Sequence, residues 1–276
     1  MSHLFGLIIA VSLLRSAMWL LEMDSSYYVE EVALIIVFGG TISAAIITYS
    51  VPELVKMVRA LFRIGRKMPE SRTATVQLVI DLAKRVHNSK QALYDAIEDK
   101  KYNPYFRDGL ELIVSGFSRE DIETIMSERL FRDRERDESY GVLLRTISKY
   151  PPAFGLVGTV LGLVSVMRAV STGADSAEIG LQMALALVAT FYGLILTNFI
   201  LVPMSENLIN KAAKNMTHRE LMLEGLLLLK DNRSPVFVQE VMNSYLSPLQ
   251  RKDLVGIRGG MTRAAGSGEP PAASAS

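Results

Sequence analysis

The sequence contains no cysteine among its 276 residues and only three histidines. The lack of cysteine excludes disulfides, thiolate metal sites and cysteine-based catalysis. The histidines, His3, His87 and His218, lie too far apart for a metal-binding motif, and the sequence contains no phosphate-binding glycine loop. We therefore expect no enzymatic activity, with no catalytic residue, no metal site and no cofactor.

An excess of charge of either sign is also absent. The chain has 30 Lys and Arg residues against 29 Asp and Glu residues, which gives a formal net charge of +1. A nearly neutral chain lacks the overall basic character that attracts nucleic acid. We therefore expect no nucleic-acid partner.

Long apolar runs, by contrast, are plentiful, since apolar residues make up 49% of the chain. Four segments have about 20 residues, the length that crosses ~30 Å of hydrocarbon. They are Leu4–Leu21, Val32–Ser50, Pro152–Val170 and Leu181–Pro203. The first has no basic start and no clean cleavage site, so we interpret it as a retained helix and not as a signal peptide. It carries Arg15 near its middle, whose side chain must snorkel, pair or face protein.

The distribution of basic residues predicts how these spans are oriented. Of the 30 Lys and Arg residues, 19 lie between residues 51 and 150 and nine follow residue 210. The two short connectors, "EMDSSYYVEE" and "STGADSAEIG", contain none. Because basic loops stay on the cytoplasmic side, we expect both termini and the 51–150 segment in the cytoplasm, with membrane lipid around the spans.

Helical patterns run through the chain with few β-branched alternations, so the expected fold is an all-α membrane protein. It would have four transmembrane helices, with a helical cytoplasmic domain between the second and the third. The expected segments are 1–50 with transmembrane helices 1 and 2, 51–150 with the cytoplasmic domain, 151–204 with transmembrane helices 3 and 4, 205–258 with C-terminal cytoplasmic helices, and 259–276 as a disordered tail of small residues and proline.

Several helix boundaries are also expected from the sequence. Residues 71–101 continue the helical pattern of the segment before them. Asn103 and Pro104 then predict the start of a shorter helix, and Gly116 predicts its end. The fourth span is expected to continue as a helix beyond Pro203 into the cytoplasm.

The third and fourth spans each carry a face of small residues. Such faces allow two helices to approach closely. The residues are Gly155, Gly158 and Gly162 on the third span, and Ala184, Ala186, Ala189 and Gly193 on the fourth. Packing within one chain and packing between copies of the chain are equally compatible with this pattern.

Thr159 and Thr190 lie close to the middle of the third and fourth spans. In one interpretation, each hydroxyl bonds only to the carbonyl four residues earlier in its own helix. In the other, both hydroxyls line a polar path and offer oxygen atoms to a passing cation. Neither threonine can hold a proton near neutral pH, so the titratable carboxylate of such a path must come from another polypeptide.

Pro152 and Pro203 lie at the cytoplasmic ends of the same two spans. Proline is favourable in the first turn of a helix and stops or kinks a helix near its end. The alternative interpretation is that both prolines act as hinges, which pass an event in the membrane to the cytoplasmic helices. Both interpretations fit the spacing.

Charged residues are dense between Lys100 and Glu138. The ordinary explanation is a solvated helix face. The alternative is a docking surface that recognises its partner by charge complementarity.

Several stretches resemble the MotA/PomA family, the A subunits of bacterial flagellar stators, within the MotA/TolQ/ExbB proton channel superfamily. The similar segments in the second, third and fourth spans are "IVFGGTISAAIITYSVPEL", "PPAFGLVGTVLGLV" and "MALALVATFYGLILTNFILVPMSENL". The cytoplasmic "NPYFRDGLELIVSG" and the C-terminal "SPVFVQEVMNSYLSP" are similar too. The resemblance covers roughly residues 1–252, in the order of the family.

The resemblance implies an ion-driven rotary motor in the bacterial inner membrane. In this family a pentamer of A subunits surrounds two copies of a B subunit. The partner implied here is a MotB/PomB-like B subunit, whose single span carries an ion-binding aspartate and whose periplasmic domain grips peptidoglycan. Flow of H+ or Na+ turns the A ring, which pushes on FliG in the rotor.

The resemblance also implies roles for individual residues. It assigns Thr159 and Thr190 to the ion path, and Pro152 and Pro203 to coupling between the membrane and the cytoplasm. The candidates for contact with the rotor are Lys100, Lys101, Arg107, Asp108 and Glu111.

Two other functions are weighed against this one. A TolQ/ExbB-type subunit would energise envelope processes, but such proteins typically have three spans, with the large cytoplasmic segment after the first. Here two spans precede that segment. A membrane scaffold without ion flow is the second alternative, and it would tolerate alanine at both Thr159 and Thr190.

Overall fold

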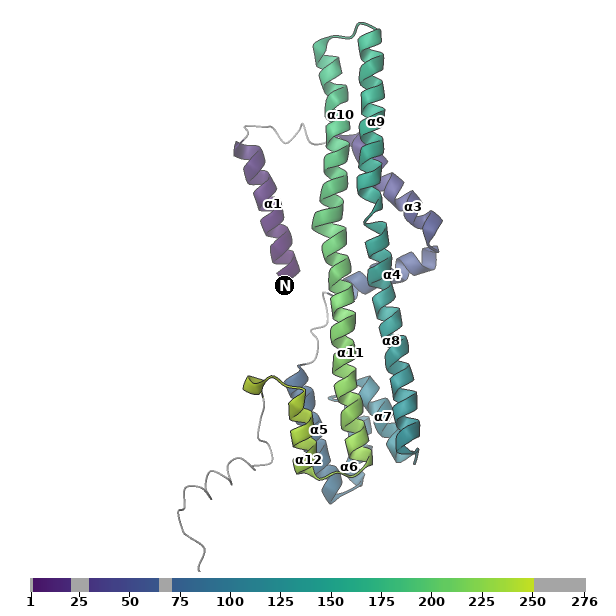
Figure 1. The fold of residues 1–276 in the computed structure, drawn as a ribbon, viewed down its shortest axis with the longest axis vertical. Coiled ribbons are helices and arrows are strands. Elements are labelled where there is room, and N and C mark those ends of the chain that lie inside the picture. The colour runs from purple at the N-terminus through teal and green to yellow at the C-terminus, as the bar shows by residue number, and fades with distance from the viewer. Residues whose placement is uncertain (1, 21–29, 65–70, 251–276) are drawn as a thin grey trace, which may run out of the picture. The chain divides into compact units, whose positions relative to one another are not determined.

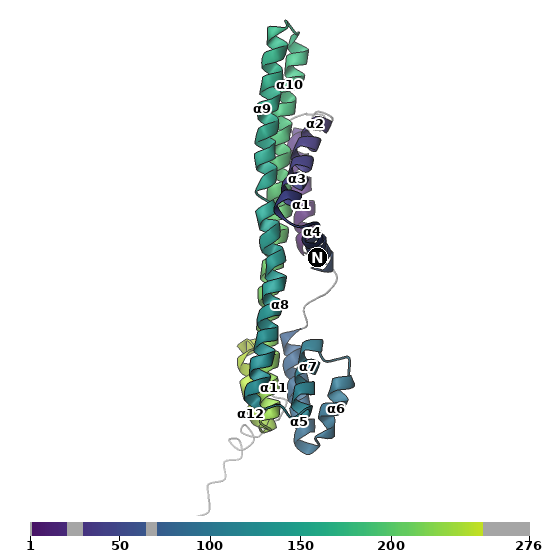
Figure 2. The ribbon, with the colours of Figure 1, turned by 90° about the vertical axis from the view of Figure 1, so that its right-hand side faces the viewer.

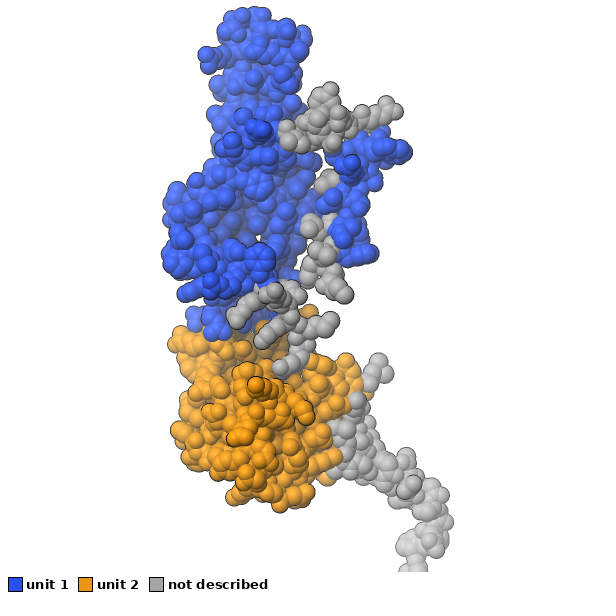
Figure 3. Space-filling view, turned by 180° about the vertical axis from the view of Figure 1, so that it is seen from behind, with its two compact units in different colours: residues 1–68, 135–213 blue, residues 69–134, 214–276 orange. Residues whose placement is uncertain are grey.

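The computed structural model describes residues 2–20, 30–64 and 71–250. These residues form helices joined by short turns, and no strand occurs among them. The chain divides into two compact units, shown in blue and orange in Figure 3. Unit 1 consists of residues 1–68 and 135–213, and unit 2 consists of residues 69–134 and 214–276.

Unit 1 contains the apolar helices (Figure 1). Its elements are α1 (Ser2–Leu20), α2 (Glu31–Leu34), the π-helical η2 (Ile35–Gly39), α3 (Gly40–Thr48), α4 (Val51–Ile64), α9 (Tyr150–Ser171), α10 (Ser176–Ile195) and the π-helical η3 (Leu196–Leu201). It also includes the C-terminal part of α8 (Arg119–Ile147) and the N-terminal part of α11 (Val202–Lys230). The continuation of α11 beyond Pro203 confirms the expected helix there.

The centre of unit 1 is the pair α9 and α10, which run side by side in both ribbon views (Figures 1 and 2). Both η2 and α3 pack against α9. A small cluster of buried residues, among them Val37 and Ala189, holds this group together. Most large apolar side chains of α9 point outward, however, and Leu156 and Val164 are more than half exposed.

Within residues 2–20, 30–64 and 71–250, three helical segments are long and apolar enough to cross a membrane, and they match the second, third and fourth expected spans. They are Glu31–Thr48, Arg119–Ser171 and Ser176–Lys230. Helix α1 corresponds to the first expected span, but its apolar stretch, Ile8–Leu20, is shorter. Arg15 is exposed on it. Exposed apolar side chains over such lengths fit a membrane protein, since lipid covers them without cost.

Unit 2 has an ordinary buried core. Its helices are α5 (Arg72–Asn88), α6 (Gln91–Glu98), α7 (Pro104–Val114), α12 (Pro235–Ser244) and the short 3-10 turn η4 (Pro248–Gln250), together with the remaining parts of α8 and α11. Leu110, Ile122 and Leu226 are completely buried in this core. Each such side chain contributes about 1.5–3 kcal/mol on removal from water.

The start and end of α7 agree with the sequence. The Asn103 side chain accepts a hydrogen bond from the Tyr105 N–H, and Pro104 occupies the first turn. Gly116 follows the helix with a φ of +86°, a conformation that glycine adopts without strain. Residues 71–101 are mainly helical, as expected, but they form two helices, α5 and α6. The break lies at Ser89, whose backbone is extended, with φ −155° and ψ 126°.

Two expectations fall on residues outside the described ranges. The tail at 259–276 lies there, as does most of the first short connector. The structure therefore does not bear on either of them.

Candidate functional site

Thr159 on α9 and Thr190 on α10 face each other. Their Oγ1 atoms are 2.5 Å apart, within hydrogen-bond distance. The Thr159 hydroxyl lies 3.0 Å from the Ala186 carbonyl and 3.2 Å from the Gly155 carbonyl, and the Thr190 hydroxyl lies 3.4 Å from the same Gly155 carbonyl. The bond to Gly155 is the expected local one, four residues back. The cross-helix contacts show that the two hydroxyls also form one polar group.

Small residues allow this contact, because they bring the two helix backbones together. A Cβ atom added at Gly155 would lie 3.0 Å from the Ala189 carbonyl oxygen, and one at Gly162 would lie 2.7 Å from the Ala186 Cβ. At Gly158 an added Cβ would overlap the Ala189 side chain. The small faces of the two spans thus pack against each other within one chain, and they set the separation at which the hydroxyls meet.

The chemistry of the site is that of neutral oxygen atoms. Two hydroxyls and the carbonyls of Gly155 and Ala186 converge at half-buried positions. Oxygen ligands of this kind suit hard cations. Within α9 there is no acidic residue, and in α10 the only one is Glu178, in the first turn. The described residues contain no cluster of His, Cys, Asp and Glu that could hold a metal ion.

The two prolines have different positions in their helices. Pro152 is in the first turn of α9, next to Pro151, whereas Pro203 is the second residue of α11, which continues η3 without a break. A Cβ added at Gly193 would lie 2.5 Å from the Pro151 carbonyl oxygen. Gly193 therefore differs from the other small residues, since it brings α10 against the start of α9.

The candidates for rotor contact lie together in unit 2. Lys100 and Lys101 are exposed in the turn before α7. Asp108 and Glu111 are exposed on α7, one helical turn apart. Arg107 is half-buried, and its Nε has no hydrogen-bond partner.

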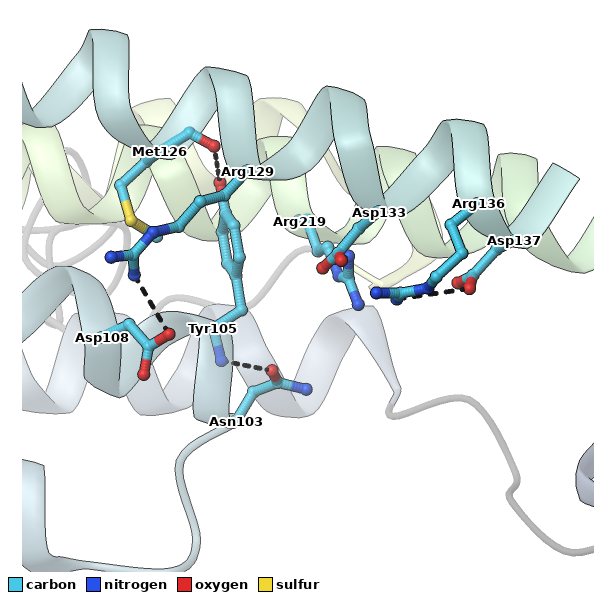
Figure 4. Close-up of polar contacts among 9 residues, drawn as sticks. All are labelled: Asn103, Tyr105, Asp108, Met126, Arg129, Asp133, Arg136, Asp137 and Arg219. Atoms are coloured by element: carbon cyan, nitrogen blue, oxygen red, sulfur yellow. Dashed lines mark hydrogen bonds and ion pairs between the residues drawn. The ribbon is translucent and has the colours of Figure 1, made fainter. Parts of the chain in front are cut away.

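Asp108 is not free of partners, because it forms an ion pair with Arg129 on α8, with 3.1 Å between Nη1 and Oδ2 (Figure 4). Both side chains are about half exposed. Such a pair contributes little to stability. It leaves Asp108 available to exchange partners at the surface.

A second group of charges, which sequence reasoning missed, is more deeply placed. Asp133 on α8 pairs with Arg219 on α11, and both side chains are less than a third exposed. The Arg219 guanidinium also lies 5.6 Å from the centre of the Tyr105 ring. The Tyr105 hydroxyl in turn donates to the Met126 carbonyl at 3.0 Å (Figure 4). Burial raises the pKa of Tyr105 to about 12.

The sequence offered one signal for this group. The charged run "RDRERDE" on α8 places Asp133 one helical turn from Arg129 and from Asp137. Its partner Arg219 lies 86 residues away in sequence. Only the folded chain identifies this pair.

Known proteins resemble this chain over most of its length. Residues 97–221 match the MotA/TolQ/ExbB proton channel family. Motility protein A of Bacillus subtilis is 29% identical over 258 residues, which cover 91% of this chain and 92% of that protein. Chemotaxis protein PomA of Vibrio alginolyticus is 25% identical over 255 residues, covering 91% and 97%.

A solved structure has a similar fold. The flagellar MotAB stator complex from Bacillus subtilis matches with a TM-score of 0.79 and 26% identity, over 90% of this chain and 96% of the matched one. This likeness and the sequence matches cover the helices that carry Thr159 and Thr190. Residues 97–221 thus match the MotA/TolQ/ExbB proton channel family, and most of the chain is similar to motility protein A and PomA.

Proposed function

We propose that this chain is the A subunit of an ion-driven flagellar stator, which couples the flow of H+ or Na+ through the inner membrane to torque on the rotor. The chain itself provides oxygen atoms along the ion path. A MotB/PomB-like B subunit provides the carboxylate. The relatives named motility protein A and PomA, and the MotAB stator complex, support this assignment.

The observation that carries the proposal is the contact between the Thr159 and Thr190 hydroxyls at 2.5 Å. These hydroxyls sit on helices whose outward apolar side chains need lipid or another helix to cover them. The two hydroxyls lie at mid-span, and their own helices place no carboxylate beside them. They can line an ion path once a helix of a partner protein places a carboxylate next to them. A protein that merely packed helices would not need two hydroxyls in contact there.

The proposed assembly follows from the family. The chain crosses the bacterial inner membrane four times, with both termini in the cytoplasm. Five copies of the chain surround two B subunits. Unit 2 then lies on the cytoplasmic side. The surface that contacts FliG consists of charged residues of this unit, since charge complementarity favours selective docking. They are the exposed Lys100, Lys101, Asp108 and Glu111 and the half-buried Arg107.

The first experiment is to purify the chain from its native membrane and to identify by mass spectrometry what remains bound. The proposal predicts a single-span protein with an intramembrane aspartate and a peptidoglycan-binding domain. A partner of the ExbD/TolR kind would instead favour the TolQ/ExbB-type function. Recovery without any aspartate-bearing partner would contradict ion coupling altogether and favour a scaffold.

The transported ion is identified by a separate measurement on the same complex. If rotation stops when Na+ is replaced by K+ at a constant pH gradient, the transported ion is Na+. Rotation that persists in K+ and stops with a protonophore assigns H+.

A further inference from the structure

Thr197, in η3, makes a buried hydrogen bond to the turn between α8 and α9. Its Oγ1 donates to the Ser148 carbonyl at 2.8 Å, and the two residues are only 9% and 4% exposed. A threonine in a helix usually returns its hydroxyl to the carbonyl four residues earlier. Thr41 does this, with 2.6 Å to the Val37 carbonyl. The bond from Thr197 to this turn therefore needs a specific explanation.

Pro152 provides that explanation. The Ser148 carbonyl lies four residues before Pro152, so in an uninterrupted α-helix it would accept the N–H of residue 152. Proline has no N–H, and the carbonyl is left without its helix partner. A buried carbonyl without a donor costs as much as a lost hydrogen bond. The Thr197 hydroxyl supplies the donor that Pro152 lacks.

Thr197 also makes a backbone hydrogen bond in the helical turn before Pro203. Its own carbonyl accepts the N–H of Val202, five residues later, which is the wide π-helical pattern. Pro203 follows directly. One residue thus bonds through its side chain to the turn between α8 and α9, and through its backbone to the start of α11.

We propose that Thr197 is a positioning residue that couples the two proline sites, so that a change of helix geometry at Pro152 is passed to Pro203. This proposal rests on the proposed stator function, because it assigns both sites to the transmission of torque. Thr197 acts through helix geometry and does not contact the ion. The close approach of Gly193 to the Pro151 carbonyl, one turn before Thr197, keeps the two helix segments in register.

The test uses the complete chain with its own B subunit in a flagellated host that lacks its A subunit. The speed of a bead on one motor rises in steps as stators join, so the number of steps reports assembly and the step height reports torque per stator. Thr197→Val keeps the shape of the side chain and removes the donor. Thr197→Ser keeps the donor. Thr146→Val is the matched control, because the Thr146 hydroxyl bonds only to the Val142 carbonyl in its own helix.

The proposal predicts that Thr197→Val lowers the step height by about twofold or more, since one buried bond shifts a two-state balance by up to roughly tenfold. Thr197→Ser and Thr146→Val keep the height of the unmodified chain. Fewer steps of full height would overturn the proposal, because they indicate a role in assembly alone. If the unmodified chain gives no steps, the proposed stator function is wrong. If Thr197→Val gives steps of unchanged number and height, only the coupling role of Thr197 is wrong.

A double-mutant cycle tests the physical basis in purified complexes, independently of rotation. Pro152→Ala restores a backbone N–H opposite the Ser148 carbonyl. Thr197→Val is therefore expected to lower the melting temperature less in the Pro152→Ala background than in the unmodified chain. Equal losses in both backgrounds would show that Thr197 does not replace the missing N–H, and would overturn the proposal even if the variant failed to join motors.

Discussion

Thr159 and Thr190 come from different helices, 31 residues apart in sequence, and place their hydroxyl oxygens 2.5 Å from each other. Each hydroxyl has one hydrogen to donate and two lone pairs to accept with. Together with the Gly155 and Ala186 carbonyls, they form a satisfied network that still presents oxygen atoms at half-buried positions. The proposed ion path uses these oxygen atoms as its contribution from this chain.

Removal of both hydroxyls is expected to stop ion-driven rotation. Thr159→Ala with Thr190→Ala takes away two oxygen atoms of the proposed path but leaves the packing glycines intact. Each helix also keeps its backbone bonds, so the protein should still reach the membrane and bind its B subunit. The measurement is rotation together with co-purification of the partner. Thr159→Ser with Thr190→Ser is the control, and rotation of the double-alanine protein would favour a scaffold.

A methyl group at Gly162 is expected to disturb the α9–α10 packing. The added Cβ would lie 2.7 Å from the Ala186 Cβ, and overpacking of this kind costs about 1–3 kcal/mol. Gly180→Ala on α10 is the matched control, because nothing lies within 4 Å of its added Cβ. Alanine favours a helix by up to about 1 kcal/mol over glycine. We thus expect a lower melting temperature in detergent for Gly162→Ala and no loss for Gly180→Ala.

The Asp133–Arg219 pair is expected to matter more for stability than the exposed pairs of α8. Asp133→Asn leaves the Arg219 guanidinium with a weaker partner at a site less than a third exposed. A loss of about 1–3 kcal/mol in the free energy of unfolding is typical of such a change. Glu128→Gln breaks the Glu128–Arg132 pair, where both side chains are about two-thirds exposed, and should cost about 0.5 kcal/mol or less. Equal effects in thermal unfolding would contradict this account.

Alkaline pH is expected to destabilise unit 2 through Tyr105. Burial raises the pKa of this phenol to about 12, above the value of 10 for an exposed tyrosine. The folded state therefore holds the proton more tightly than the unfolded state. Its contribution to stability is complete below pH 10 and declines as the pH rises towards 12. Tyr105→Phe should show a smaller decline over this window, although it is less stable at neutral pH because the bond to the Met126 carbonyl is lost.

Local chemistry explains which parts of the fold could be predicted. The start of α7 at Asn103 and its end at Gly116 depend on single residues with strong preferences, and both expectations are confirmed. The break at Ser89 could not be predicted, because the apolar period continues through Ala92 and Ala96, which are buried like the residues before the break. The spacing of apolar residues indicates which side chains are buried, but it does not indicate the backbone angles of a single polar residue such as Ser89.

Some residues of the candidate site could likewise be predicted from the sequence, and others could not. Hydroxyls and small residues in apolar spans stand out in a sequence, so Thr159 and Thr190 were identified from it. Thr197 looked like any other threonine, although the prolines imply carbonyls without donors. Which side chain supplies the donor depends on packing between segments 49 residues apart. The same holds for Asp133 and Arg219.

The most direct test of the central claim is a disulfide cross-link between this chain and its B subunit. The chain has no cysteine, so Thr190→Cys introduces a unique thiol, and a second thiol is placed beside the aspartate in the partner's span. Ile47→Cys, 87% exposed on α3, is the control position. A disulfide needs Cα atoms about 4.4–6.8 Å apart. The account predicts that Thr190→Cys forms the cross-link and Ile47→Cys does not; a cross-link from Ile47→Cys with none from Thr190→Cys would contradict it.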